Sequence, residues 1–250
     1  MLNLVGLGLW DENGLTLEGI EISKNSDEVF IETYTSVWYG SIENLEKIID
    51  KKIGRIGRGD LEDKFGYILK KSKVKKITIL IPGDPLVATT HLNLILEAKK
   101  MGIDTRVVHN SSIYSAVGET GLHLYKFGYT ITIPFPEKTK GEKPNSIFER
   151  FSENRKRGLH TLCLLDISSE EKKYMTPNEG IKILLSGGLV EDDYIIVFCR
   201  AGSKNSDIFF GMVRDLIELD FGDPPYVIII PGELHFTEKE FLDYYGIKIS

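Results

Sequence analysis

The sequence predicts an α/β protein with a mainly parallel sheet, and two observations carry this prediction. Short apolar runs rich in β-branched residues recur along the chain, and Ile77–Ile81 is nearly all apolar, as expected for a central parallel strand covered on both faces. Such runs pass through loops containing Gly, Pro or Ser into segments with helical spacing. Strand, loop and helix in repeated succession build a parallel sheet.

Length and charge set the broad class. The chain has 250 residues, of which 42% are hydrophobic, enough for one large domain or two of about 125 residues each. Lys and Arg number 31 against 37 Asp and Glu, which gives a formal net charge of -6. This balance argues against a nucleic-acid backbone as the main partner, because such binding needs many cations on one face.

The cysteines and the N-terminus indicate a cytosolic protein. Cys163 and Cys199 are the only two cysteines, and both lie inside apolar runs, which favours buried, reduced thiols over a disulfide framework. The apolar start of the chain carries no basic segment and is soon interrupted by Gly6 and Gly8. No run approaches the roughly 18–20 apolar residues of a membrane span.

Residues 1–114 are expected to form an N-terminal α/β domain around Ile77–Ile81. After that strand, Leu92, Ile95 and Leu96 recur at helical spacing, with Thr89 or Thr90 available to cap the helix. Three further runs have strand character, namely Leu2–Val5, Val29–Tyr34 and Arg106–Val108.

Residues 115–250 are expected to form a C-terminal α/β domain. Its strands are predicted at Tyr129–Pro134, Thr161–Ile167, Tyr194–Cys199 and Tyr226–Ile230. A helix is predicted over Asp207–Leu219, where the apolar stripe consists of Ile208, Phe209, Met212, Val213, Leu216 and Ile217. A final helix opens with Thr237-Glu238-Lys239-Glu240, a capping-box pattern, and is expected to end at Gly246.

The loop after Ile77–Ile81 is the first candidate binding segment. It reads Pro82-Gly83-Asp84-Pro85, and the carboxyl ends of parallel strands are where α/β proteins bind ligands. The prolines stiffen the loop, and Gly83 lets the backbone bend or approach a ligand closely. On pattern alone, a ligand site and a purely structural turn remain equal alternatives.

Two other loops offer weaker signals. Gly6-Leu7-Gly8 ends the first strand, but Asp11 stands where a dinucleotide-binding fingerprint requires its third glycine, which disfavours a nicotinamide cofactor. Ser112, which follows the strand Arg106–Val108, could cap a helix or bind a ligand. The spacing of the five histidines matches no metal site, and neither a Gly-x-Ser-x-Gly elbow nor a phosphate-binding Gly-x-x-x-x-Gly-Lys loop occurs.

Taken together, these stretches resemble the diphthine synthase family, which belongs to the tetrapyrrole-methylase-like (class III) methyltransferases. The matches run in order over essentially the whole chain. In the first half they are Val5–Leu9, Tyr34–Ser36, Pro82–His91, Ser112–Gly118, Gly121-Leu122 and Leu124–Gly128. In the second half they are Gly158–Leu162, Leu165–Ile167, Tyr174–Thr176, Arg200–Ser203, Asp220–Pro225 and Pro231-Gly232.

The resemblance implies two α/β domains with mainly parallel or mixed sheets, S-adenosylmethionine bound in the cleft between the domains, and a homodimer of such chains. The spacing of the histidines and cysteines predicts no metal site, and no residue is assigned as general base because the leaving group needs no acid and orientation can supply much of the rate. Asp84 is interpreted as a binding residue. The family often has histidine at the position of Tyr226. The implied cofactor contacts are Leu9, Asp84, Val87, Ser112, Ile113, Leu165, Ala201 and Tyr226.

The implied substrate is elongation factor 2, at a histidine that carries a 3-amino-3-carboxypropyl group, whose amino nitrogen is methylated repeatedly. The chain is of the shorter, archaeal type, so three methyl transfers are expected. Alternatives are a class III methylase of a corrinoid or of RNA, an NAD-dependent Rossmann oxidoreductase, or a non-catalytic interaction module. The wider class usually shows Gly-x-Gly-Pro-Gly-Asp near its N-terminus, and the departure at Leu9-Trp10 counts against a corrin or porphyrin substrate.

Overall fold

The protein is described by a computed structural model, which covers residues 1–32, 34–63, 66–139, 141, 143–168 and 171–244. The chain divides into two compact units, Met1–Tyr114 and Ser115–Ser250. Each unit contains its own five-stranded sheet and its own apolar core. The mixed parallel and antiparallel α/β architecture confirms the predicted fold class.

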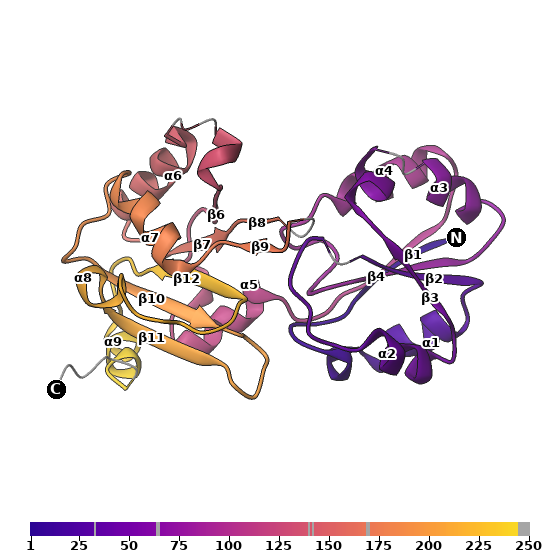
Figure 1. Ribbon diagram of the computed structural model, residues 1–250, viewed down its shortest axis with the longest axis horizontal. Helices are drawn as coiled ribbons and strands as arrows, with labels where there is room; N and C mark the ends of the chain where they lie inside the picture. The colour runs from indigo at the N-terminus through magenta and orange to yellow at the C-terminus, as the bar shows by residue number, and fades with distance from the viewer. Residues whose placement is uncertain (33, 64–65, 140, 142, 169–170, 245–250) are drawn as a thin grey trace. The chain divides into compact units, whose positions relative to one another are not determined.

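The first unit is built on a fully parallel sheet with strand order β3-β2-β4-β1-β5 (Figure 1). The strands are β1 (Leu2–Gly6), β2 (Glu28–Glu32), β3 (Ile53–Ile56), β4 (Ile77–Ile81) and β5 (Thr105–Val108). All four predicted strands are therefore present, and β3 is an addition. Thr33, which belonged to one predicted strand, lies outside the described residues.

Helices cover both faces of this sheet. One face packs against α1 (Leu17–Lys24) and α2 (Ile42–Ile49), and the other against α3 (Gly66–Ser72) and α4 (His91–Lys100) (Figure 1). Every β4 side chain is buried, as a strand covered on both faces requires. The chain leaves β1 toward the face of α1 and leaves the adjacent β4 toward the face of α4, so a topological switch point lies between these two strands.

The helix predicted after β4 is present as α4, but its buried stripe is not the set of residues noted for helical spacing. Of those three, only Ile95 is buried, while Leu92 and Leu96 are 64% and 50% exposed. The stripe instead consists of His91, Leu94, Ile95 and Ala98, which follow the i, i+3, i+4, i+7 spacing from the first residue of the helix. Thr90 is the N-cap residue, and the Thr89 hydroxyl donates to the Pro85 carbonyl (2.6 Å).

The second unit contains a mixed sheet with strand order β11-β10-β12-β7-β6, in which only β6 and β7 run parallel. Its strands are β6 (Ile131–Ile133), β7 (Thr161–Leu165), β10 (Tyr194–Cys199), β11 (Asp207–Met212) and β12 (Tyr226–Ile230). The predicted strand Thr161–Ile167 is interrupted at Asp166, and Ile167 opens a separate hairpin of β8 (Ile167–Ser168) and β9 (Lys173–Tyr174).

The helix predicted over Asp207–Leu219 was wrong in its first half. Asp207–Met212 forms β11, paired antiparallel with β10, and only Val213–Leu216 is helical as α8. Ile208 and Phe210 are buried while Asp207 and Phe209 are less so, which is the alternation of a strand. The hydrophobic residues fit both the helical period of about 3.6 residues and the strand period of about 2 residues. Pairing with the neighbouring strand β10 stabilises the strand conformation.

Among the described residues of this unit, the remaining α-helices are α5 (Ile113–Ala116, which begins in the first unit), α6 (Asn145–Lys156), α7 (Pro177–Leu185) and α9 (Phe236–Leu242). The sequence analysis did not identify α6 or α7, although Thr176 and Glu179 form a capping box with Pro177 at the first helical position. In α9 the capping box is formed by His235 and Glu238, two residues earlier than predicted. The predicted end at Gly246 lies outside the described residues.

Both cysteines are free and buried, as predicted. Burial raises the pKa of the Cys163 thiol well above its usual value. Burial also raises the pKa of Cys199, to about 12. Both thiols are therefore protonated and unreactive at neutral pH.

Candidate functional site

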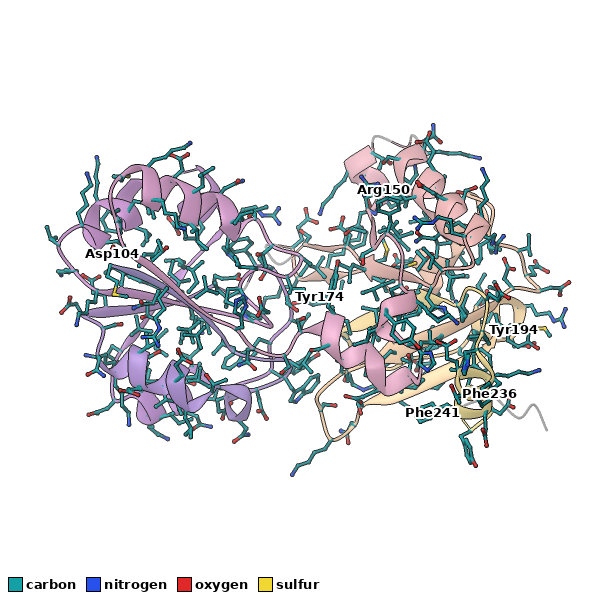
Figure 2. All side chains as sticks on the ribbon, turned by 180° about the vertical axis from the view of Figure 1, so that it is seen from behind. Asp104, Arg150, Tyr174, Tyr194, Phe236 and Phe241 are labelled. Atoms are coloured by element: carbon teal, nitrogen blue, oxygen red, sulfur yellow. The ribbon has the colours of Figure 1, made fainter. Side chains whose placement is uncertain are left out.

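In the first unit, five predicted cofactor contacts gather at the carboxyl edge of the sheet. Leu9 lies in the loop after β1, Asp84 and Val87 lie in the loop after β4, and Ser112 and Ile113 follow β5. These three strands are neighbours, in the order β4-β1-β5. Asp104, just before β5, marks the opposite, amino edge (Figure 2). Ligands of open α/β sheets bind at the carboxyl edge, beside a switch point such as the one between β1 and β4.

Two of these loops pair with each other through glycines. The N–H of Gly8 donates to the Gly83 carbonyl (3.2 Å) and the N–H of Gly83 donates to the Gly8 carbonyl (2.8 Å). Both residues have positive φ, 77° and 71°, which glycine adopts without strain. At Gly6 an added Cβ would lie 2.6 Å from the Gly83 carbonyl oxygen, so only glycine fits between the loops.

Asp84 joins the loop after β4 to the segment after β5. The residue is only 5% exposed. One carboxylate oxygen accepts from the Leu86 N–H (2.9 Å), and the other accepts from the Asn110 N–H (3.1 Å) and lies 2.8 Å from Nδ1 of His109. The carboxylate thus fixes the shape of the site by three bonds to the protein itself. The sequence analysis had expected it to hold the cofactor's own donors.

Asn110 is a second organising residue, and the sequence analysis missed it. Its side-chain amide donates to the carbonyls of Gly6 and Gly14, both at 2.9 Å, and its Oδ1 accepts from the Ser111 N–H (2.7 Å). One side chain therefore ties the end of β1, the turn Glu12–Gly14 and the segment after β5. A His-Asn pair directly after a predicted strand was the available signal.

The other predicted contacts are close to this framework. Ser112 is buried and immediately precedes α5, whose first residue is the half-buried Ile113. Leu9 and Val87 are also half-buried. Around Gly83 there is room, because an added Cβ would meet only the Ser112 Cβ, at 3.9 Å.

A buried carboxylate also ends the neighbouring strand β2. Glu32 accepts from the N–H groups of Tyr34 (2.9 Å) and Thr35 (3.2 Å) and from the Thr35 hydroxyl. Burial raises the pKa of Glu32 above its usual value, although these donors oppose the effect. Nε2 of His91 lies 3.5 Å from the Tyr34 hydroxyl, so the carboxyl edge is organised from β2 to β5.

In the second unit, the three predicted contacts share one edge of the mixed sheet. Tyr226 is the first residue of β12 and pairs with Cys199, the last residue of β10, so Ala201 follows two residues beyond that pair. Leu165 ends β7, one residue past Leu164, whose partner is Val227. Ala201 is 7% exposed, and the Tyr226 hydroxyl donates to the Gly222 carbonyl.

Arg200 shapes the same edge. It has positive φ (52°). Its guanidinium donates to the carbonyls of Phe221 (2.6 Å), Asp223 (3.1 Å) and Asn205 (2.9 Å). The turn after β10 is thereby fastened to the segment that leads into β12.

The opposite edge of this sheet carries a cavity of about 670 Å³ that includes none of the predicted contacts. It lies where β12 ends at Ile230 and where β7 and β10 begin, and its walls include Phe151, Arg155, Tyr194 and Lys239. Tyr194 and the C-terminal helix residues Phe236 and Phe241 are exposed aromatic side chains of this unit (Figure 2). Within the described ranges, no group of three or more potential metal ligands occurs, and no helix is long and apolar enough to cross a membrane.

Comparison with known proteins identifies the family. Residues 1–217 match the family described as Tetrapyrrole (Corrin/Porphyrin) Methylases. The chain is 46% identical to the diphthine synthase of Methanocaldococcus jannaschii, with 98% of each chain covered, and 42% identical to that of Methanococcus aeolicus, with 100% of each covered. A crystal structure of a diphthine synthase matches with a TM-score of 0.90 and 34% identity, covering 98% of this chain and 95% of the other.

The chain belongs to the diphthine synthase family. This membership confirms the predicted family and shows that the protein is a methyltransferase of diphthamide biosynthesis. It removes the dinucleotide-binding alternative, against which the structure also argues. In this chain the first α-helix, α1, starts at Leu17, well beyond Gly8, so within the described residues 1–32 no α-helix N-terminus lies at the glycine turn as a dinucleotide-binding fold requires.

Proposed function

We propose that the protein transfers methyl groups from S-adenosylmethionine to elongation factor 2, at the amino group of a 3-amino-3-carboxypropyl-histidine. The observation that supports this most directly is the similarity to diphthine synthases over the full chain. The site geometry supports it independently, because the predicted contacts gather beside the switch point of the parallel sheet.

The residues at this edge fit such a cofactor. S-adenosylmethionine supplies a methyl group on a positively charged sulfur. A neutral amine attacks this methyl group and a neutral sulfide leaves, so the leaving group needs no acid catalyst. The room beside Gly83 and the glycine-paired loops let a ligand approach the backbone closely. In this proposal the cofactor contacts are those that the family resemblance implies, namely Leu9, Asp84, Val87, Ser112, Ile113, Leu165, Ala201 and Tyr226.

Asp84 acts in this proposal mainly through the loops that it joins. Both carboxylate oxygens already accept hydrogen bonds from the protein, so the group holds the segments after β4 and β5 in one arrangement. Such preorganisation supplies rate by orientation, which is the main requirement of an in-line methyl transfer.

Two finer features complete the proposal. The amino group receives three methyl groups in succession, and the enzyme acts as a homodimer. Both rest on the family resemblance. Light scattering on the purified protein would measure the mass of the assembly directly, and a monomer would remove the second feature.

Intact mass spectrometry of the substrate tests the proposal. The protein is incubated with S-adenosylmethionine and elongation factor 2 that carries the 3-amino-3-carboxypropyl group. We expect a mass gain equal to three methyl groups, localised to the modified histidine. An unchanged factor, together with transfer to a corrinoid or an RNA, would contradict the proposed substrate.

A further inference from the structure

His109 lies at the carboxyl edge and has a titratable side chain, but it is not one of the predicted cofactor contacts. It follows the last residue of β5, and its side chain is 69% exposed. Its Nδ1 lies 2.8 Å from Asp84 Oδ2, and Asp84 is the one ionisable group that contacts it among the residues the structure describes. A buried carboxylate thus holds an exposed imidazole at the candidate site.

The geometry fixes which ring nitrogen carries the proton. The Asp84 carboxylate accepts N–H bonds at both oxygens, from Leu86 and from Asn110, and acts here as an acceptor. Nδ1 of His109 therefore donates to Asp84, and the lone pair of the neutral imidazole is on Nε2. A carboxylate that orients an imidazole in this way is a common device for proton abstraction by the second nitrogen.

We propose that His109, oriented by Asp84, is the general base that removes the proton from the acceptor's ammonium group before each methyl transfer. This inference rests on the proposed function. The N–H bond breaks, its proton goes to Nε2, and its electron pair stays on the nitrogen. That pair forms the new nitrogen–carbon bond to the methyl group, while the pair of the sulfur–carbon bond stays on sulfur. The exposed imidazolium then releases its proton to water.

The size of the effect follows from the acceptor. An α-amino-like group with a pKa of about 8 or somewhat higher is only about 1–10% neutral at pH 7. Without the base, the enzyme depends on acceptor that arrives already neutral. The expected loss of kcat/KM is therefore about 10- to 100-fold at pH 7, and it shrinks as rising pH deprotonates the acceptor in solution.

The test uses His109→Asn, whose amide can still donate to Asp84 but has no basic nitrogen. kcat/KM for methylation of elongation factor 2 is measured from pH ~6.5 to ~9.5, and the affinity for S-adenosylhomocysteine is measured by calorimetry. His235→Asn is the matched control, because His235 is an exposed N-cap residue of α9 and asparagine is also a good N-cap. His109→Gln serves as a second variant if His109→Asn does not fold.

We expect cofactor affinity to be unchanged within about twofold and the deficit of His109→Asn to fall from about 10- to 100-fold at pH 7 to less than about threefold near pH 9.5. The His235→Asn control should match the wild type throughout. A deficit that is the same at every pH, a parallel loss of cofactor affinity, or no deficit would overturn the assignment. If wild-type enzyme transfers no methyl to the factor while His109→Asn binds cofactor normally, the proposed function fails, and the base loses its substrate with it.

Discussion

In the first unit all five strands run parallel, whereas in the second unit only β6 and β7 do. Parallel strands all end at one edge of their sheet. The loops after β1, β4 and β5 can therefore be expected to lie at the same edge before the strand order is known. In the mixed sheet, the shared edge combines the end of β7, the start of β12 and the turn after β10. In a parallel sheet, the loops that share the ligand-binding edge can be predicted from the sequence, because they follow the strands. In a mixed sheet, the segments that share an edge can be identified only once the strand pairing is known.

The two units also place their buried carboxylates differently. Asp84 and Glu32 stand at the carboxyl edge of the parallel sheet, where they accept hydrogen bonds from the segments that follow β2, β4 and β5. Glu238, in the first turn of α9, accepts from the N–H groups of His123 and His235, both at 2.7 Å, from Lys126 Nζ (2.6 Å) and from His160 Nε2 (3.0 Å). We infer that Glu238 stabilises the second unit, while the acids of the first unit shape a site. The predictions below test this division.

The largest expected effect is on folding of the second unit. Glu238→Gln removes the charge that four donors surround, and leaves Lys126 beside an uncharged amide. We expect a loss of about 3–5 kcal/mol in the free energy of unfolding, the usual result of removing one partner of a buried pair. Urea denaturation measures it, and Glu240→Gln, at an exposed position of the same helix, should change stability by less than about 0.5 kcal/mol. Equal effects of the two variants would contradict this role.

Glu238 also predicts how stability depends on pH. Burial would raise its pKa, but Lys126 and the N–H groups of His123 and His235 outweigh burial and hold the pKa at about 2. Its contribution, about 3 kcal/mol, is therefore present above the unfolded value of about 4.3 and is lost as pH falls from there through about 2. Urea titrations across this window should show a steep loss for the wild type and a shallow one for Glu238→Gln. Wild-type and Glu238→Gln stabilities that fall in parallel with pH would contradict this contribution of Glu238.

His160 adds an earlier step to the same profile. Burial lowers its pKa, although its bond to Glu238 acts in the opposite direction, and its Nδ1 accepts from the Gly232 N–H (2.8 Å), so the ring is neutral in the fold. Because the unfolded chain takes up this proton more readily, stability should begin to fall as pH drops below about 6.5. NMR titration of the ring should show no protonation at pH ~6.5 in the folded protein, and an ordinary titration curve would contradict the assignment.

In the first unit, a single methyl group at Gly6 should disturb the paired loops. Gly6→Ala places Cβ 2.6 Å from the Gly83 carbonyl oxygen and 2.7 Å from the Asn110 Cβ, so backbone must move. We expect a cost of about 1–3 kcal/mol and weaker binding of S-adenosylhomocysteine. Gly66→Ala is the matched control, since nothing lies within 4 Å of its added Cβ. If Gly6→Ala binds S-adenosylhomocysteine as tightly as the wild type, the paired loops do not contribute to cofactor binding.

Asn110→Ala should have a smaller effect, limited to binding. It removes the donors to the Gly6 and Gly14 carbonyls and frees three segments from one another. We expect affinity for S-adenosylhomocysteine to fall about tenfold, equivalent to roughly 1.4 kcal/mol, with the second unit unaffected. Calorimetry measures the affinity, and the denaturation midpoint measures the stability. A loss of stability without a loss of affinity would show that Asn110 has only a structural role.

The smallest effect is expected at Leu96, on the exposed face of α4. Leu96→Ala, at a residue that is 50% exposed, should cost less than about 0.5 kcal/mol, while Ile95→Ala in the core should cost about 2–4 kcal/mol. Denaturation of both variants tests the corrected helical face, and a larger cost at Leu96 would contradict it.

The sequence predicted the strands of the first unit well, because a strand buried on both faces is a continuous apolar run such as Ile77–Ile81. It failed where one run fits two periods, as in Asp207–Met212, since only pairing with β10 decides between strand and helix. The loop containing Asp84 was found from its position after a strand. The sequence could indicate Asn110 and His109 only by their place directly after a strand, because their hydrogen bonds are made to residues far away in the sequence.

The central claim is that the carboxyl edge of the parallel sheet, fastened by Asp84, binds the methyl donor. Calorimetric titration of S-adenosylhomocysteine into the wild type and into Asp84→Ala tests it most directly. The account predicts clear binding by the wild type and an affinity at least about tenfold weaker in a variant whose second unit unfolds at the same denaturant concentration. An Asp84→Ala protein that folds normally and binds as tightly as the wild type would contradict it.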